Sequence, residues 1–476
     1  MLWGKSGFAQ TGSRKVWISE MKIKELVDKQ RKYFLTGATL SYEARMDALR
    51  RIRWALGKYE PELKRALYRD LHKSASESYM TEISMTKSEL SYCMRHLAGW
   101  MRREHVKTNL ANFHAKSFTI AEPYGVTLVM APWNYPVLLC LEPLINAIAA
   151  GNCVIVKPSA YAPNVSAVLA NMLAACFAPE YVAVVEGGRA ENNALLEQRF
   201  DHIFFTGSVE VGKIVLEKAA RHLTPVTLEL GGKSPCIVDQ TANIPVAARR
   251  IVFGKILNSG QTCVAPDYLV VHKKVKEQLF LAMKKELVRM LGEHPLKSEE
   301  YPRMVNEKHY NRVMGLLKGE LAVVGGYGNP DTLQIAPTIL DEVSLDAPIM
   351  REEIFGPVLP TLTFKSKEEL LTILRHFEKP LACYLFTTDK MMEKWLLANV
   401  SFGGGCINDT IIHLATSDMG FGGVGSSGMG SYHGKTGFET FSHRKSVVKK
   451  YNWIDVPLRY HPYAEWKDAI IRRVMR

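Results

Sequence analysis

Apolar residues recur at intervals of three and four positions in the first part of the chain, as Ala48, Ile52 and Leu56 illustrate. This period is that of an amphipathic helix, so residues 21–104 are predicted to form a helical scaffold. Residues 107–122 change to short alternating runs of apolar and polar side chains. Such alternation predicts the strands of a hairpin.

From Gly125 onwards, short apolar runs alternate with longer helical patterns. The predicted strands are 126–132, 153–159, 182–185 and 202–205, and the predicted helices between them are 136–151, 163–177 and 191–198. Alternation of this kind predicts a parallel sheet with helices on both of its faces. Because ligands of such sheets bind beyond the carboxyl ends of the strands, the residues that follow each strand are the first candidates for chemistry.

A second alternating unit begins after Ser234. Its predicted strands are 235–238, 268–271, 358–364 and 382–386, and its predicted helices are 244–258, 273–290, 367–377 and 390–398. Residues 292–335 are predicted to be a polar region of helix and turn. Residues 442–453 are strand-like and basic, and we expect them to pair with the 107–122 hairpin. The chain is therefore predicted to be an α/β protein with more than one domain.

The composition of the 476 residues, with 47% hydrophobic and 23% charged side chains, is that of a globular protein. A chain of this length predicts two or three domains. The formal net charge of +13 is spread in clusters such as residues 50–53 and is not gathered in a basic tail. Solvated helix faces explain this distribution better than nucleic-acid binding, so we expect no nucleic-acid partner.

The eight cysteines are widely spaced and form no Cys-x-x-Cys pair or Cys/His cluster. This spacing is typical of a reducing compartment and argues against a structural metal, so we expect a cytoplasmic protein without a metal site. Residues 126–150 are interrupted by prolines and a glutamate, and they predict no membrane span. Residues 1–20 lack the apolar core of a signal peptide and are left out of the fold prediction. The basic end, 470–476, is too short to span a bilayer, although it could touch a membrane surface weakly.

Polar residues follow three of the predicted strands: Asn134, Lys157 and Ser208. Ser208 could cap the next helix while free amides of that helix meet a phosphate, but an ordinary capped turn is the alternative. Lys157 could equally be solvated, and Asn134 could hold a turn. Cys263, in Gly-Gln-Thr-Cys, has Glu229 upstream as a candidate carboxylate partner. On local sequence alone, such a cysteine is more typical of an inert core residue than of a nucleophile.

Two glycine patterns imitate nucleotide-binding loops. Residues 423–428 have the spacing Gly-x-Gly-x-x-Gly, but no hydrophobic strand directly precedes them, so we predict a loop. Residues 232–234 imitate the end of a P-loop, yet the first glycine of that motif would fall on Thr227. The sequence therefore predicts no nucleotide hydrolysis.

Seven motifs occur together in the same order and at similar spacing as in a known superfamily. They are PWNYP (132–136), KPS (157–159), FTGS (205–208), ELGGKSP (229–235), GQTC (260–263), EEIFGPV (352–358) and FGG (421–423). With these motifs the chain resembles the aldehyde dehydrogenase superfamily from about residue 22 onwards. The flank CVAPDY (263–268) looks most like the class 3 branch, which includes fatty-aldehyde enzymes and is typically dimeric.

The resemblance implies an α/β fold built from a Rossmann-like cofactor domain, a second α/β domain that carries the catalytic cysteine, and a small β oligomerisation arm. The corresponding residues are 22–106 with 123–231, 232–420, and 107–122 with 440–455, followed by a C-terminal tail, 456–476. A homodimer is the expected assembly.

The resemblance also implies a division of catalytic roles. Cys263 would attack the aldehyde carbonyl, and the Cys263 amide with the Asn134 side chain would hold the oxyanion. A hydride then passes to the nicotinamide and leaves a thioester. Glu229 would serve as general base for the water that releases the acid, which a carboxylate can do near neutral pH if burial raises its pKa.

NAD or NADP is the implied cofactor. The implied binding residues are Lys157, Gly207, Ser208, Glu353, Phe355 and Trp133, of which Lys157 is expected at the adenosine ribose, Ser208 with Gly207 near the pyrophosphate and Glu353 with Phe355 at the nicotinamide ribose. Many NAD-preferring relatives carry an acidic residue three places after this lysine, where it repels a 2′-phosphate, whereas this chain has Ala160. The loss of that repulsion predicts that both cofactors are used.

Tyr135, Ile411 and His413 are candidates for lining a substrate tunnel, with core packing as the alternative. We therefore expect aldehydes with a medium or long aliphatic chain or an aromatic ring. A CoA-acylating aldehyde dehydrogenase stays open as an alternative, although Glu229 argues against it because several acylating branches lack a carboxylate there. A cofactor-independent cysteine esterase also stays open, as does a non-catalytic binding role that leaves Cys263 dispensable.

Overall fold

The structure, a computed structural model, describes residues 20–474, and predictions made for residues 1–19 and 475–476 lie outside this range. The predicted helical scaffold is confirmed. Its helices are α1 Glu20–Leu35, α2 Tyr42–Leu71, α3 Ala75–Ser78 and α4 Ser84–Trp100, with a π-helical turn, Tyr79–Ile83, between α3 and α4. α2 begins where Ser41 Oγ accepts the Ala44 amide at 3.1 Å, and it ends at His72, whose φ of 55° is left-handed. The short segment between α2 and α4 packs into the core, where Glu82 is fully buried.

Six strands form the first sheet, in the order β17-β7-β6-β3-β4-β5. Their bounds are β3 Val126–Met130, β4 Cys153–Lys157, β5 Val182–Val184, β6 His202–Thr206, β7 Val226–Glu229 and β17 Gly428–Met429. The pairs are parallel except β17 with β7, which is antiparallel. Every residue of β3, β4 and β6 is buried, as expected for a parallel sheet covered on both faces.

Helices cover both faces of this sheet, as predicted. They are α5 Leu138–Ala150, α6 Pro163–Ala174, α7 Arg189–Leu196 and α8 Val209–Ala220. One apolar cluster joins α1, α7 and α8 to the sheet through residues such as Ile23, Leu195 and Val215. A second cluster joins α2, α5 and α6 to the opposite face, and α15 Gly434–Thr440 packs against α5.

Seven strands form the second sheet, in the order β10-β13-β14-β9-β8-β15-β16. The strands are β8 Pro235–Val238, β9 Tyr268–His272, β10 Leu321–Val324, β13 Thr338–Asp341, β14 Val358–Phe364, β15 Ala382–Phe386 and β16 Gly404–Ile407. The helices of this unit are α9 Ile244–Ile256, α10 Lys276–Leu291, α11 Glu307–Leu316, α12 Pro348–Arg351, α13 Lys367–Arg375 and α14 Lys390–Asn399. Only β10 is antiparallel to its neighbour, so the second unit is also an α/β layer structure.

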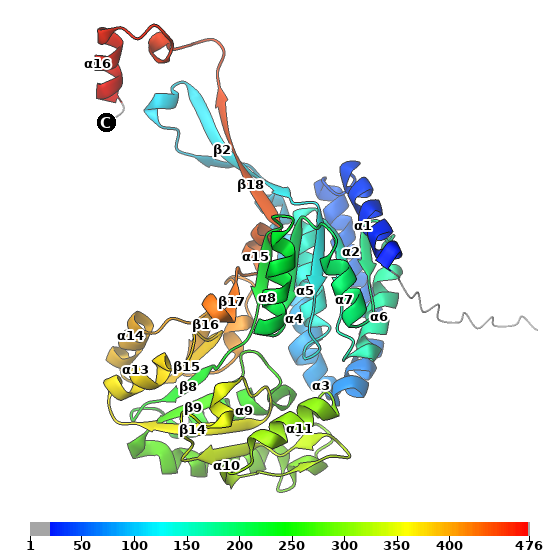
Figure 1. The fold of residues 1–476 in the computed structure, drawn as a ribbon, viewed down its shortest axis with the longest axis vertical. Coiled ribbons are helices and arrows are strands. Elements are labelled where there is room, and N and C mark those ends of the chain that lie inside the picture. Colours follow the sequence, from blue (N-terminus) through cyan, green and yellow to red (C-terminus); the bar gives the residue numbers. More distant parts are fainter. Residues whose placement is uncertain (1–19, 475–476) are drawn as a thin grey trace, which may run out of the picture.

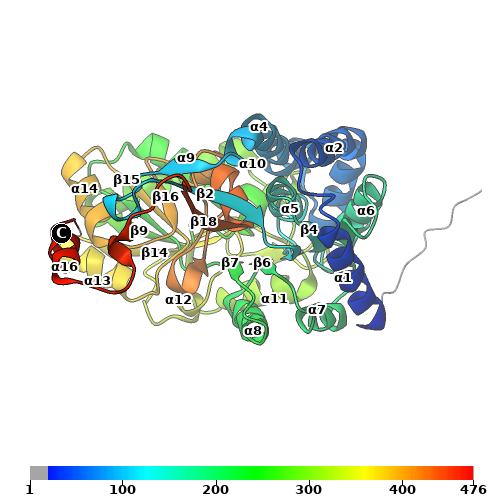
Figure 2. The same cartoon turned by 90° about the horizontal axis from the view of Figure 1, so that it is seen from above.

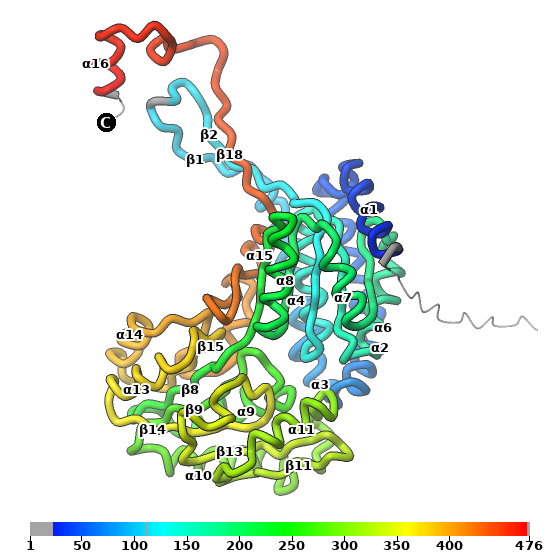
Figure 3. Tube along the Cα trace, in the orientation of Figure 1, coloured from blue at the N-terminus to red at the C-terminus, as the bar shows by residue number. Residues whose placement is uncertain are grey.

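A three-stranded arm projects from the body of the molecule (Figures 1 and 3). It consists of β1 Glu104–Val106, β2 Ala115–Pro123 and β18 Ser442–Lys450. β18 pairs antiparallel with β2 in continuous register from Ser442 opposite Pro123 to Lys450 opposite Ala115, which confirms the predicted pairing. Seen from above, the arm extends over the side occupied by the second sheet (Figure 2), and Figure 1 shows that it stays clear of that sheet. α16 Glu465–Val474 follows at its outer end.

Several details differ from the predictions. The first hairpin strand, β1, lies before residue 107, and β7, β13 and β16 were not predicted. The region 292–335, expected to hold only helix and turn, also contains β10 and the small hairpin β11 Gly328–Asn329 and β12 Gln334–Ile335. Residues 423–428, predicted to be a loop, contain a 3-10 turn, Gly425–Ser427, and Gly428 already belongs to β17 at the edge of the first sheet. Within residues 20–474, no helix is long and apolar enough to cross a membrane.

Candidate active site

A cavity of about 810 Å³ opens at the carboxyl ends of the strands of the first sheet. The second unit contributes its other wall, so residues far apart in the chain face one another across it. Of the residues selected from the sequence, those that line it are Trp133, Asn134, Gly207, Ser208, Glu229, Cys263, Glu353 and Phe355. Asn134 and Ser208, which follow strands of the first sheet, therefore share this cavity with Cys263, and their roles stay predictions.

A second cavity, of about 500 Å³, also reaches Cys263. Most of its wall is apolar, and the predicted tunnel residues Tyr135 and Ile411 belong to it. Other apolar side chains in the wall are Met80, Met85, Leu138, Leu139, Phe253, Leu257, Ile412, Leu414 and Phe421. Among the described residues that line these two cavities, Cys263 alone lines both. Cys263 therefore lies where the two cavities meet.

The loop that carries Cys263 joins α9 to β9 along an unusual backbone path. Asn258 and Ser259 are both left-handed, with φ values of 49° and 54°. Gly260 has a φ of 71°, and a Cβ atom there would lie 2.2 Å from the carbonyl oxygen of Gly356. No side chain fits at that position, so glycine is required for this path.

The Cys263 thiol is surrounded by groups that favour its neutral form. Burial raises its pKa to about 12, and the carboxyls of Glu353 and Glu229 contribute in the same direction. A thiolate is the nucleophilic form of cysteine. The raised pKa therefore favours the protonated thiol over the thiolate.

Glu229 ends β7 and is only 2% exposed. Neither of its carboxylate oxygens has a hydrogen-bond partner among the described residues, and burial raises its pKa well above the ordinary value. The backbone around it is fixed, because the Gly207 amide donates to the Glu229 carbonyl oxygen at 3.0 Å. An unpaired carboxyl group that faces the cavity is free to exchange a proton with water or with a substrate.

The side chain of Asn134 forms a hydrogen bond to the cysteine loop. Its Nδ2 donates to the Gln261 carbonyl oxygen at 3.1 Å, and Asn134 is 2% exposed. Because a side-chain amide has two N–H donors, one of them is left for a ligand beside Cys263. The geometry brings together the cysteine, the carboxylate and the amide that the sequence singled out.

The larger cavity has features that fit a dinucleotide. Ser208 Oγ accepts the Val211 amide at 3.4 Å and caps α8, whose free N-terminal amides suit a phosphate. Gly231 lets the backbone approach closely, since a Cβ there would lie 2.2 Å from Glu353 Oε2. Burial, followed by the charge of Asp267, raises the pKa of Glu353 to about 8.

Phe355 and Trp133 pack against each other at the side of this cavity. Their ring centroids are 5.4 Å apart at an interplanar angle of 82°, and Phe355 has a left-handed φ of 50°. The centroid of the His309 ring lies 5.1 Å from that of Trp133. An aromatic wall of this kind gives a flat surface against which a planar ring can bind.

Lys157 ends β4 as predicted, but it does not line the larger cavity. Its Nζ donates to the carbonyl oxygens of Pro158 and Gly187, both at 2.7 Å. Burial lowers its pKa to about 8. The lysine is therefore a buried, backbone-bound group and not the solvated lysine that the sequence left as an alternative.

His413 is not among the residues that line the apolar cavity, contrary to its prediction as a tunnel residue. Its ring turns toward β16, where Nδ1 lies 3.7 Å from Cys406 Sγ and the ring centroid lies 6.0 Å from that of Tyr384. Burial lowers its pKa to about 4, so the ring is neutral. The alternative of core packing holds for this residue.

Sequence reasoning missed several residues of both cavities. Arg312 on α11 lines the larger cavity and donates to the Ile354 carbonyl oxygen at 2.6 Å. In the sequence it looks like any charged residue on a solvated helix face. Glu142 and His433, which line the apolar cavity and lie 3.2 Å apart, were also missed, because one is in an apolar run and the other in a glycine-rich stretch. Within residues 20–474, no cluster of three or more potential ligands could hold a metal ion.

A parallel sheet with a cavity of dinucleotide size at its strand ends, and a cysteine where that cavity meets an apolar one, is an arrangement suited to an oxidoreductase with a nucleotide cofactor. The comparisons with known proteins make the assignment definite. The chain belongs to the aldehyde dehydrogenase family, whose model matches residues 16–447. It is an oxidoreductase that acts on aldehydes with NAD or NADP.

Individual relatives are similar over nearly their whole length. The chain is 46% identical to 4,4'-diaponeurosporen-aldehyde dehydrogenase of Staphylococcus aureus, over 90% of this chain and 94% of that protein. It is 42% identical to the dimeric NADP-preferring aldehyde dehydrogenase of Canis lupus familiaris, again over 90% and 94%. The substrate-bound state of Staphylococcus aureus AldH superposes with a TM-score of 0.94 at 44% identity, and covers 95% of this chain and 99% of that one.

Proposed function

We propose that the protein oxidises apolar aldehydes to carboxylic acids through a thioester on Cys263. The Cys263 thiol passes its proton to solvent, and the thiolate Sγ attacks the aldehyde carbon while the Cys263 backbone amide and Asn134 Nδ2 stabilise the oxyanion. A nicotinamide held in the larger cavity beside Trp133 and Phe355 would supply the acceptor for the hydride that leaves as the oxyanion collapses to the thioester. Glu229 then takes a proton from the water that attacks the thioester, which releases the acid and restores the thiol.

The position of Cys263 between the two cavities carries this proposal. A cofactor in the larger cavity and an aldehyde in the apolar cavity would approach the same sulfur atom from different sides. Hydride transfer requires this arrangement, because the donor carbon must be bound to the sulfur while it faces the acceptor ring. A thiol in a single closed pocket would not favour such a reaction.

The decisive experiment is a panel of aldehydes with NAD and with NADP, read by the absorbance of the reduced nicotinamide. We expect Cys263→Ala to abolish turnover while it leaves cofactor binding intact. Cys406→Ala is the matched control, because Cys406 is the other cysteine that is not fully buried, and this variant should keep its activity. Turnover by Cys263→Ala, or the lack of any aldehyde-dependent signal from the wild type, contradicts the proposal.

The same panel decides between the two alternative reactions. A CoA-acylating enzyme would release an acyl-CoA and require CoA for turnover, whereas the buried, unpaired carboxyl of Glu229 supports water as the acceptor. A cofactor-independent esterase would hydrolyse esters at full rate but would not reduce NAD or NADP. Product analysis with and without CoA separates these outcomes.

For the cofactor, we propose that both NAD and NADP are used. Ala160 follows β4 and is exposed, so it neither bonds a ribose hydroxyl nor repels a 2′-phosphate. The proposed binding residues in the larger cavity are Ser208 with Gly207, Glu353 with Phe355, and Trp133. Lys157 lies outside the lining of that cavity, and the resemblance alone supports its proposed place at the adenosine ribose. A strong preference for NAD in steady-state kinetics would contradict the proposal of dual use.

For the substrate, we propose aldehydes with medium or long aliphatic chains or aromatic rings. The apolar wall of the 500 Å³ cavity supports this class, since burial of each methylene contributes about 0.8 kcal/mol. We expect kcat/KM in the aldehyde panel to rise with chain length until the cavity is filled. A flat or falling dependence on chain length would contradict the assignment.

We propose a homodimer that assembles through the arm formed by β1, β2 and β18. Apolar side chains on this arm are exposed in the single chain, among them Val106 at 51%, Leu110 at 65% and Val448 at 52%. We also propose a cytoplasmic location, which the eight unpaired cysteines support. Light scattering and cell fractionation test these two points.

A further inference from the structure

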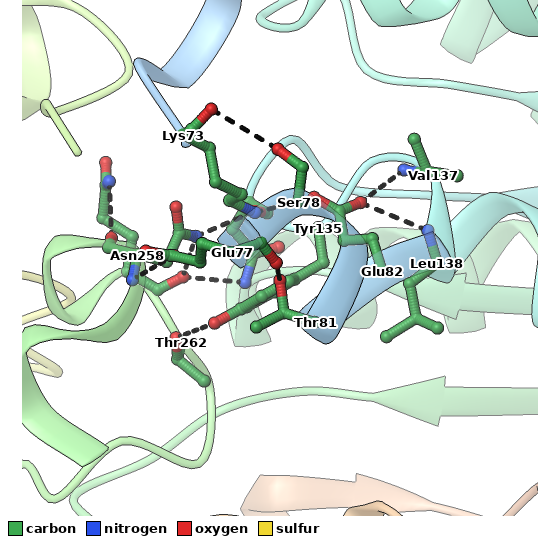
Figure 4. A network of polar contacts seen from close by, with 12 residues as sticks. Lys73, Glu77, Ser78, Thr81, Glu82, Tyr135, Val137, Leu138, Asn258 and Thr262 are labelled. Atoms are coloured by element: carbon green, nitrogen blue, oxygen red, sulfur yellow. Dashed lines mark hydrogen bonds and ion pairs between the residues drawn. The ribbon is translucent and has the colours of Figure 1, made fainter. Parts of the chain in front are cut away.

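A fully buried ion pair lies behind the active site (Figure 4). Lys73 Nζ is 2.6 Å from Glu82 Oε1, and both side chains are 0% exposed. The two residues come from the segment between α2 and α4, which contains no residue selected from the sequence. Burial of two charges costs several kcal/mol per ion unless other contacts compensate. The other hydrogen bonds of this pair therefore show what the buried charges hold in place.

The pair holds the chain from Asn134 to the start of α5. Lys73 Nζ donates to the Asn134 carbonyl oxygen at 3.2 Å and lies 4.2 Å from the centre of the Tyr135 ring. Glu82 Oε2 accepts the amide of Val137 at 2.8 Å and that of Leu138 at 3.3 Å, at the start of α5. The backbone from residue 134 to residue 138 is therefore fixed from behind by one lysine and one glutamate.

The same segment also holds the cysteine loop. Glu77 Oε1 accepts the amide of Asn258, the left-handed residue of that loop, at 2.8 Å. Asn258 Nδ2 in turn donates to the Asn134 carbonyl oxygen at 2.8 Å, so the two networks meet at one atom. A further bond of 2.6 Å joins Tyr135 Oη to Thr262 Oγ1, next to Cys263 (Figure 4).

We propose that Lys73, Glu77 and Glu82 are positioning residues for aldehyde oxidation, which set the Asn134 amide and the cysteine loop at the separation that the oxyanion requires. This inference rests on the proposed roles of Asn134 and Cys263. None of the three residues lies among the atoms that react. Lys73 bonds the Asn134 carbonyl oxygen and Glu82 bonds the backbone amides shortly after it, while Glu77 bonds the amide of Asn258 in the cysteine loop. Without these contacts the two halves of the oxyanion site would be free to move apart.

A merely structural ion pair is the alternative, because Lys73 and Glu82 also connect α2 to α5. The two roles differ in what they predict. A structural ion pair contributes only to the free energy of unfolding. Replacement of such a pair by well-packed apolar side chains often leaves activity intact. A positioning cluster changes the rate of the step that forms the oxyanion, and it acts only as long as Asn134 is present.

The test uses the double variant Lys73→Met/Glu82→Gln. Methionine fills the space of the lysine stem, and glutamine keeps an oxygen for the Val137 amide, so that no unpaired charge is left in the core. We expect the pre-steady-state burst of reduced cofactor to slow by about 10- to 100-fold, which is the scale of a small misplacement in an active site. Cofactor affinity, measured by direct titration, should be unchanged.

The matched control is Glu60→Gln/Lys64→Met, which removes a partly exposed 2.7 Å ion pair on α2 and also the 2.6 Å pair of Glu60 with Lys87, neither of which involves Asn134 or the cysteine loop. We expect its burst rate to stay within about twofold of the wild type, as for a partly exposed pair of small energetic value. A second, independent variant, Glu77→Ala, removes the acceptor of the Asn258 amide. It should slow the burst even if the double variant proves too unstable to isolate.

A mutant cycle with Asn134→Ala separates positioning from structure. If the cluster acts through Asn134, the double substitution causes no further loss of burst rate in the Asn134→Ala background. An equal loss in both backgrounds, or a folded double variant and a folded Glu77→Ala variant that both retain the wild-type burst, overturns the inference. The absence of a burst in the wild type would instead refute the proposed function itself.

Discussion

Replacement of Glu229 by glutamine separates the two halves of the proposed reaction. The amide cannot act as a base, but its shape is that of the carboxyl, so the cavity around Cys263 is preserved. Acylation and hydride transfer consume no water, so they do not need Glu229 as the base that activates water. We therefore expect a first burst of reduced cofactor close to one equivalent per active site. Release of the acid should then slow by about 10²- to 10⁴-fold, the range typical of a general base.

The structure also fixes the sign of the effect on stability. Burial raises the pKa of Glu229 well above its ordinary value, so the folded protein holds this proton at pH values where the unfolded chain has lost it. Below the pKa that the carboxyl has in the unfolded chain, such a group does not change the free energy of unfolding. Above it, the group lowers that free energy by about 1.4 kcal/mol per pH unit, until the pH reaches the pKa of the carboxyl in the folded protein. Glutamine carries no titratable proton. The variant should therefore gain stability relative to the wild type as the pH rises.

Stopped-flow absorbance measures the burst and the steady state in one trace, and thermal unfolding across a pH series measures the difference in Tm. We expect that difference to grow by on the order of 2 °C per pH unit above the ordinary carboxyl pKa. The wild-type steady-state rate should rise over the same range as the carboxylate form appears. An unimpaired steady state in the variant, or a Tm difference that is independent of pH, would refute the reasoning.

Three further predictions concern other parts of the molecule. Asn134→Ala should slow the burst itself by about 10²- to 10³-fold, as expected for the loss of an oxyanion donor, and stopped-flow traces that match the wild type would contradict this. Ala160→Glu should lower kcat/KM for NADP by about 5-fold more than for NAD, since a like charge at an exposed site costs ~1 kcal/mol, whereas the uncharged Ala160→Gln should not discriminate. Val448→Asp should weaken self-association by about 100-fold in light scattering, and an unaltered dimer would exclude that face of β18 from the interface.

Regular elements followed from the sequence because their patterns are local. The β8 and β14 bounds were predicted to the residue, since a short apolar run flanked by turn residues has few other interpretations. β7 was missed because its run, Val226–Glu229, is short and ends on a carboxylate that belongs to the site. β17 is only two residues long, and its strand character comes from pairing with β7 and not from its own composition.

The candidate site was predictable where it lies at strand ends and unpredictable where it depends on packing. Asn134, Glu229 and Cys263 occur in motifs, so the resemblance located them before any coordinates. Lys73 carries no such signal, because a buried lysine and a solvated one look alike in sequence. His413 is the opposite case, a residue that the sequence selected but that the cavity does not include. Its neighbours Ile412 and Leu414 line the apolar cavity, while its own ring turns toward β16.

The meeting of two cavities at a single sulfur atom has a consequence for inhibition and for the order of release. An apolar compound that fills the 500 Å³ cavity leaves the larger one open, so it should compete with the aldehyde but not with NAD or NADP. For the same reason, the proposed reaction would allow the reduced cofactor to leave while the acyl chain is still attached to Cys263. The vacated space would include the cavity wall at Glu229, so we expect the departure of the cofactor to open the route by which water reaches the proposed thioester.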